Sequence, residues 1–245
     1  MNLFKLFRKT ELPPQETENL PPLNVIYDQQ TFSVMKKVIS EKSNCVDVGC
    51  HVGEILKKML DFSPRGQHYA FEPIPELCQG LQEQFGVLPN VSVSCAALSD
   101  KVGSSEFQHV VSNPGYSGLK KRRYDRDNEV IGKISVQTDT LDNFLPPGTP
   151  IDFIKVDIEG GEVGFFRGAL QTIKNNRPYI VFEHGAGGAD YYGDGPADVY
   201  EILVEQCGLK LTLMENWLAK KPPFSRQDLL DQFYNGTNYY FLAYP

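Results

Sequence analysis

Long apolar runs, paired cysteines and an excess of positive charge are all missing from this sequence of 245 residues. No apolar run reaches the ~18 residues that a membrane-spanning helix needs. The N-terminus also lacks the apolar core and small-residue cleavage site of a secretion signal. We therefore expect a cytoplasmic protein without a transmembrane segment. The formal net charge of −7 excludes a general nucleic-acid binder, whose binding face would be basic.

The cysteines show no paired spacing. They are odd in number, widely separated and contain no C-x-x-C pair, so neither a zinc site nor a disulfide framework is predicted. Reduced thiols are expected at all five positions, which are Cys45, Cys50, Cys78, Cys95 and Cys207. Although Cys50 lies in a glycine-rich loop, we interpret it as a small filler residue, because no fixed cation is adjacent in the sequence.

The length fits one α/β domain, predicted at residues 25–245, after a flexible leader at residues 1–24 that is rich in proline. Within the domain, short apolar runs alternate with amphipathic stretches, which is typical of βαβ units and a parallel sheet. Main strands are predicted at 45–48, 67–71, 91–97, 151–156, 179–183, 209–214 and 238–244. Helices are predicted at 29–40, 53–61, 75–85, 161–175, 196–206 and 225–233.

The last predicted strand is rich in aromatic residues, and we expect it to pair antiparallel with 209–214 at one side of the sheet. Extended segments at 104–111 and 133–138 flank a polar loop at 112–130. This loop is long for a compact domain, so we interpret it as a substrate lid.

The segment Val46 to Glu54, VDVGCHVGE, follows the first predicted strand and points to a nucleoside cofactor. A glycine-rich turn lets a ligand approach the backbone, and an acid that ends the second strand, here Glu72, accepts hydrogen bonds from ribose hydroxyls. Gly49 and Gly53 are spaced G-x-x-x-G rather than G-x-G-x-x-G, and Asp47 precedes them. An acid there would repel a diphosphate and suits the cationic amino-acid part of S-adenosylmethionine. The pattern favours that cofactor over NAD, although Glu72 would suit either ribose.

Several further segments make the chain resemble the FkbM-type methyltransferases over residues 25–245. They are FEPIPE at 71–76, AALSD at 96–100, TDTLDNF at 138–144, IDFIKVDIEGGEVGFFRGA at 151–169 and VFEH at 181–184. The resemblance implies a class I S-adenosylmethionine-dependent enzyme with a Rossmann-like seven-stranded sheet, mainly parallel, with helices on both faces and a final antiparallel strand.

The same resemblance implies which residues bind the cofactor. Asp47, Gly49 and Gly53 would hold the methionine part, Glu72 the ribose, and the turn at 97–100 the adenine edge. The full predicted set is Asp47, Gly49, Cys50, His51, Gly53, Glu72, Pro73, Ala97, Leu98 and Asp157. The family more often has alanine and asparagine where this chain has Cys50 and His51, which changes the polarity of the loop.

Candidate catalytic residues follow two neighbouring strands. Asp157 comes after 151–156, and Glu183 and His184 end 179–183, so all three are expected at the carboxyl edge of the sheet. We predict His184 as the general base, because its unperturbed pKa is near ~6.5. Two alternatives stay open: the three residues bind a divalent cation that activates the acceptor, or His184 is structural.

The acceptor is predicted only by class, as a hydroxyl of a sugar, glycan or natural-product-like small molecule. Tyr116, Tyr191 and Tyr192, with the glycine-rich loop 185–195, are candidates for an acceptor wall. The basic run at 120–123 fits either an anionic acceptor or a solvated surface. An NAD-dependent oxidoreductase or epimerase and a non-catalytic nucleoside-binding module remain alternatives, and the oligomeric state is not predicted.

Overall fold

The computed structural model describes residues 22–124, 126 and 128–245. Most of the predicted leader, residues 1–21, lies outside these residues, and the first helix begins at Leu23, inside the predicted leader. The strands are β1 (Cys45–Val48), β2 (His68–Phe71), β3 (Val91–Ser94), β4 (Ala96–Leu98), β5 (Gly103–Val110), β6 (Ile131–Asp139), β7 (Phe153–Val156), β8 (Tyr179–Glu183), β9 (Lys210–Thr212) and β10 (Tyr240–Tyr244).

The helices, too, follow the predicted alternation with strands. They are α1 (Leu23–Val38), α2 (Glu54–Phe62), α3 (Pro75–Gln84), α4 (Leu141–Phe144), α5 (Glu162–Gly168), α6 (Leu170–Asn176), α7 (Pro196–Tyr200), α8 (Met214–Leu218) and α9 (Arg226–Tyr234). Shorter turns are η1 (Pro114–Tyr116), η2 (Ala189–Tyr192) and the π-helical η3 (Glu201–Gln206). In the part of the chain that the structure describes, no helix is both long and apolar enough to cross a membrane.

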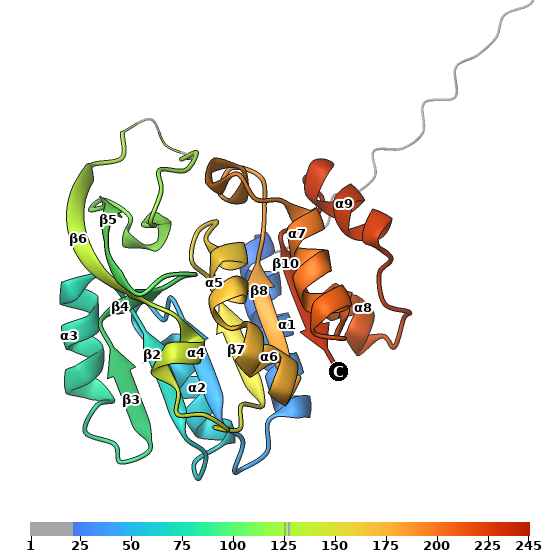
Figure 1. Cartoon of the computed structure of the whole chain (residues 1–245), viewed down its shortest axis with the longest axis horizontal. Coiled ribbons are helices and arrows are strands. Elements are labelled where there is room, and N and C mark those ends of the chain that lie inside the picture. Colours follow the sequence, from blue (N-terminus) through green and yellow to red (C-terminus); the bar gives the residue numbers. More distant parts are fainter. Residues whose placement is uncertain (1–21, 125, 127) are drawn as a thin grey trace, which may run out of the picture.

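A seven-stranded sheet in the order β3-β2-β1-β7-β8-β10-β9 forms the centre of the fold. Within this sheet, β3, β2, β1, β7 and β8 pair in parallel in that order. The strand β10 pairs antiparallel with both β8 and β9. This confirms the predicted Rossmann-like fold with a final antiparallel strand. Figure 1 shows α5 and α6 in front of this sheet and α1 behind it.

Alternating side chains along the strands build a core on each face of the sheet. Val46, Ile154 and Phe182 pack on the side of α5, α6 and α7. Their strand neighbours Cys45 and Phe153 pack on the opposite side with α1, α2 and α8. Polar residues at the strand ends also alternate between the two faces of the sheet. Only those on the same face can contact one another.

A second sheet, in the order β4-β6-β5, lies beside the carboxyl end of the main one. The predicted strand at 91–97 divides at Cys95: β3 joins the main sheet and β4 pairs with β6. β5 and β6 form an arm at the upper left of Figure 1, and the loop between them contains η1. The arm thus carries the predicted lid over the end of the sheet where ligands bind in this fold class.

Cys78 in α3 and Cys95, directly after β3, form a disulfide across 17 residues. The prediction of five reduced thiols is therefore wrong for this pair, whereas Cys45, Cys50 and Cys207 are free and buried. The pairing arises because α3 packs against β3, so the residue after β3 lies next to the helix. Such a contact depends on tertiary packing and leaves no local spacing pattern.

Candidate active site

A cavity of about 830 Å³ opens where the parallel strands β1, β2, β7 and β8 end. Eight predicted site residues line it: Gly49, His51, Glu72, Pro73, Ala97, Leu98, Asp157 and Glu183. Asp47, Cys50, Gly53 and His184 are not among the lining residues. The cavity therefore brings together most of the predicted cofactor site and two of the three predicted catalytic residues.

The glycines of the loop after β1 are required by close packing. Gly49 has a φ of +76°, and a Cβ on it would lie 2.0 Å from the backbone oxygen of Asp157. Gly53 has a φ of +84°, and its Cβ would lie 2.6 Å from the Phe85 ring in the turn after α3. Both positions combine the left-handed region with a backbone or ring contact that excludes a side chain. Gly49 in particular lets the loop approach the end of β7.

Glu72 ends β2 and is fixed by two backbone hydrogen bonds. Its carboxylate accepts from the N–H groups of His51 and Ile74, both at 2.9 Å. Burial raises the pKa of Glu72 to about 7, although these two hydrogen bonds oppose the shift. Because each carboxylate oxygen can accept two hydrogen bonds, the group keeps acceptor capacity for a ligand in the cavity.

Asp47 lies in the middle of β1 and is buried, with one orphaned oxygen. Its Oδ2 has no hydrogen-bond partner among the described residues. Burial raises the pKa of Asp47 to about 7, against the opposing charge of Lys155. A buried carboxylate oxygen without a partner is costly, so a cationic ligand group nearby would stabilise it. Glu72, which lines the cavity, thus fits a ribose, whereas Asp47 does not line the cavity and would act on the methionine part through its charge.

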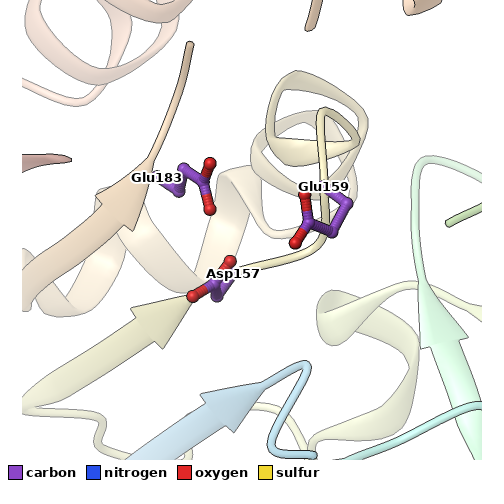
Figure 2. A group of neighbouring side chains, drawn as sticks. All are labelled: Asp157, Glu159 and Glu183. Carbon is purple, nitrogen blue, oxygen red and sulfur yellow. The ribbon is translucent and has the colours of Figure 1, made fainter. Parts of the chain in front are cut away.

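Figure 2 shows three carboxylates that face one another at the ends of β7 and β8: Asp157, Glu159 and Glu183. One oxygen of each lies within 4.8 Å of the others. Asp157 and Glu183 share a face of the sheet. Each comes two residues after one of the paired neighbours Lys155 and Val181, and residues two apart in a strand point to the same face. Glu159 reaches them from the turn after β7, where its φ is +59°.

Asp157 is held by a lysine and a tyrosine. Lys155 Nζ lies 3.1 Å from Asp157 Oδ2 and 3.3 Å from the Tyr240 hydroxyl, which donates to the same carboxylate oxygen. Burial opposes ionisation of Asp157, but the Lys155 charge and the hydrogen bonds from Glu183, Tyr240 and Lys155 outweigh it and lower its pKa. Asp157 is therefore an ionised carboxylate in the cavity.

Glu183 has the opposite shift. Burial raises its pKa well above the ordinary value, and the charge of Asp157 and the hydrogen bond with it add to the increase. Two carboxyl groups in contact do not both ionise easily, because their negative charges repel each other. Glu183 therefore keeps its proton and donates it in a hydrogen bond to Asp157.

Glu159 is neutralised by a cation from the loop 112–130. Its carboxylate pairs with Arg122, whose guanidinium lies 5.0 Å from the centre of the Tyr116 ring. Three oxygen ligands so close together would suit a hard divalent cation. Lys155 and Arg122 already pair with two of the three carboxylates, Asp157 and Glu159.

The family model of the methyltransferase FkbM domain matches residues 47–211, which include the cofactor loop and the carboxylate cluster. The chain belongs to the FkbM methyltransferase family. This confirms the resemblance drawn from the sequence and makes the protein an S-adenosylmethionine-dependent methyltransferase. Family membership also decides against the NAD-dependent and non-catalytic alternatives.

Two curated relatives are similar to this methyltransferase. The chain is 28% identical over 171 residues to the 2-O-methyltransferase NoeI of Sinorhizobium fredii, covering 63% of this chain and 70% of NoeI. It is 27% identical over 152 residues to the methyltransferase sdnD of Sordaria araneosa, covering 50% of this chain and 59% of sdnD. The crystal structure of methyltransferase FkbM from Methylobacillus flagellatus shares the fold, with a TM-score of 0.52 and 15% identity over 84% of this chain and 44% of that one.

His184 of the methyltransferase does not face the cavity, which corrects its prediction as the general base. Its side chain is fully buried, with the ring centre 5.1 Å from that of Phe233 and Nδ1 3.5 Å from Glu162 Oε2. Successive residues at a strand end point to opposite faces, so Glu183 faces the cavity and His184 faces the core. Glu162 in turn accepts from the Gly160 N–H at 2.9 Å, so the pair stabilises the turn that carries Glu159.

Besides the predicted cofactor residues, the cavity is lined by residues of the loops at 112–130 and 185–195 and by others that the sequence analysis did not name. Tyr116 and Tyr192 line it, whereas Tyr191 is an exposed residue outside the lining. The missed residues include Tyr240 and Asp28. The predicted antiparallel last strand was a partial signal for Tyr240. Its pairing with β8 sets Tyr240 opposite Glu183, but the sequence alone does not determine that register.

The raised pKa of Glu72 predicts that the difference in unfolding free energy between Glu72→Gln and the wild type depends on pH. A carboxyl whose folded pKa exceeds its unfolded pKa stabilises the fold at low pH, and this contribution is lost as pH rises through the folded value. For Glu72, a change from 4.5 to about 7 corresponds to up to about 3 kcal/mol. We expect the unfolding free energy of Glu72→Gln, relative to the wild-type apoprotein, to rise by up to that amount from pH 4 to pH 8.

Urea denaturation at both pH values measures this difference. Asp47 titrates in the same range, and the Glu72 charge contributes to its raised pKa, so the difference reports Glu72 together with its coupling to Asp47. A relative stability that stays constant across this interval would show that folding leaves the pKa of Glu72 at its ordinary value.

Proposed function

We propose that this methyltransferase transfers the methyl group to a hydroxyl oxygen of a sugar, glycan or hydroxylated small molecule. The observation that carries the proposal is an ionised carboxylate, Asp157, in the cavity that also contains the predicted cofactor residues. A hydroxyl acceptor must lose a proton during methyl transfer, and a carboxylate within reach takes it. The name of the relative NoeI, a 2-O-methyltransferase, supports an oxygen acceptor.

The cofactor would be held by residues at the ends of β1, β2 and β4. Glu72 would accept from the ribose hydroxyls, Asp47 and the backbone at Gly49 would hold the methionine part, and Ala97 with Leu98 would contact the adenine. When bound, S-adenosylmethionine supplies an electrophilic methyl group on a sulfonium. Apolar residues at the adenine side and a polar cluster at the other side orient such a ligand along the cavity.

Proton transfer is assigned to Asp157, in place of the buried His184. The acceptor hydroxyl donates its hydrogen bond to the Asp157 carboxylate, and its proton passes to that carboxylate as the new carbon–oxygen bond forms. Lys155 and Tyr240 fix the orientation of Asp157 from the side of the sheet. A carboxylate with a lowered pKa is a weak base, but it suffices because the hydroxyl proton becomes strongly acidic once the oxygen is alkylated.

A methyl-transfer screen tests the proposal. Radiolabelled S-adenosylmethionine is offered with a panel of glycans and hydroxylated metabolites, with and without EDTA, and products are analysed by mass spectrometry. We expect methylation on oxygen that persists in EDTA, because Arg122 and Lys155 already neutralise Glu159 and Asp157. Loss of transfer in EDTA, restored by Mg²⁺, would instead assign the three carboxylates to a cation. Methylation of amines alone would overturn the proposal.

A further inference from the structure

The basic run at 120–123 separates into residues with different roles. Lys120 Nζ donates to the Tyr192 carbonyl at 3.2 Å, and Arg122 pairs with Glu159. Lys121 and Arg123 are both exposed, but only Arg123 lines the cavity. No carboxylate of the described residues lies within 4.0 Å of the Arg123 guanidinium. Arg123 is thus a cation that the rest of the described chain leaves without a partner.

The position of Arg123 is fixed by the loop after β8. Its backbone N–H donates to the Gly187 carbonyl at 2.8 Å. Its guanidinium lies against Gly187, where a Cβ would meet Nη2 at 3.0 Å and Nε at 3.2 Å. Gly187 has a φ of +98°, and its N–H donates to Asp190 at 2.6 Å. Glycine at this position therefore makes room for the guanidinium.

This contact also places Arg123 beside the carboxylate cluster. The next residue, Gly188, packs on Glu159, with a Cβ position 3.4 Å from the Glu159 carbonyl carbon. The guanidinium therefore lies on the acceptor side of the cavity, one glycine away from the turn that carries Glu159.

The other charged residues of the cavity lining make Arg123 selective. They are the acids Asp28, Glu72, Asp157 and Glu159 and the paired Arg122. A negative group anywhere near the acids would be repelled, so an anion is accepted only where Arg123 can meet it. A guanidinium offers two parallel N–H donors that match carboxylate, phosphate and sulfate oxygens.

We propose that the acceptor carries an anionic group, a carboxylate, phosphate or sulfate, that binds Arg123 while its hydroxyl is presented to Asp157. This inference rests on the proposed function and names its substrate class. Arg123 acts as a specificity-determining residue and takes no part in the proton transfer.

Equilibrium binding tests this without requiring turnover. Wild type, Arg123→Gln, Arg123→Lys and the matched control Lys121→Gln are saturated with S-adenosylhomocysteine and titrated by calorimetry. The probes are p-nitrophenyl β-D-glucoside, its 6-phosphate, its 6-sulfate and p-nitrophenyl β-D-glucuronide. We expect the wild type to bind at least one anionic probe about tenfold or more tightly than the neutral one at low salt. The order among the three anions distinguishes carboxylate from phosphate and sulfate.

The variants should separate charge from geometry. Arg123→Gln is expected to lose the preference, Arg123→Lys to keep a reduced one, and Lys121→Gln to behave as the wild type. Equal binding of neutral and anionic probes, no binding of any anionic probe, or an unchanged preference in Arg123→Gln would overturn the inference. In each of these cases normal S-adenosylhomocysteine binding and O-methylation of a neutral acceptor would leave the proposed function standing.

Discussion

Replacing Asp157 by asparagine is expected to lower kcat by about 100- to 10,000-fold, the range that general-base catalysis contributes. The amide keeps the shape of the side chain but cannot take the acceptor proton. S-adenosylhomocysteine affinity should fall far less than kcat, because Asp157 is only one of the predicted cofactor residues and the variant keeps Glu72, Asp47 and Gly49. Methyl-transfer kinetics with the acceptor found in the screen, together with calorimetric titration, measure both quantities.

A matched control separates catalysis from stability. Asp152→Asn makes the same chemical change directly before β7, at an exposed carboxylate that accepts from the Asn44 N–H at 2.8 Å outside the cavity. It should leave kcat unchanged. Asp157→Asn also leaves Lys155 without its ionised partner, so thermal unfolding of both variants must accompany the kinetics. Full activity of a folded Asp157→Asn protein would assign the proton to another group.

The second large effect is expected from Gly49→Ala, which should lower the free energy of unfolding by about 2–5 kcal/mol. Part of the loss is the cost of a φ of +76° for a residue with a side chain, and part is the overlap of the new Cβ with the Asp157 backbone oxygen at 2.0 Å. Relief of that overlap pushes β1 and β7 apart at their carboxyl ends. S-adenosylhomocysteine affinity should fall as well, since Gly49 lines the cavity.

Gly80→Ala is the matched control for this substitution. Gly80 lies on the exposed side of α3, and a Cβ there has nothing within 4 Å. In a helix interior, alanine is more favourable than glycine by about 0.5–1 kcal/mol, so this variant should be more stable than the wild type. Urea denaturation of both variants gives the comparison. A Gly49→Ala protein as stable as the wild type would show that the β1–β7 contact relaxes without cost.

The sheet and the cofactor side could be predicted because their signals are local. A glycine loop after a first strand and an acid after a second are read within a few residues, and Gly49 and Glu72 lie in the cavity as expected. Strand ends also predicted that Asp157 and Glu183 lie together at the cavity, because all parallel strands end at the same edge of the sheet.

His184 shows where this local reasoning fails. Proximity to a strand end does not decide which face a side chain takes, and the alternation that turns Glu183 to the cavity turns its neighbour away. Tyr240 and the Cys78–Cys95 disulfide depend on pairings between distant segments, which have no periodic signature. The partner of Arg122 likewise depends on how the lid folds back over the turn at Glu159.

The position of β10 has a consequence for the order of events during synthesis. This strand is made after β9, yet it inserts between β8 and β9, so β9 has no neighbour in the main sheet until the last segment of the chain arrives. The same insertion delivers the Tyr240 hydroxyl to Asp157. The loop after β1 is therefore synthesised early, whereas the Tyr240 contact that orients Asp157 forms only when the final strand is in place.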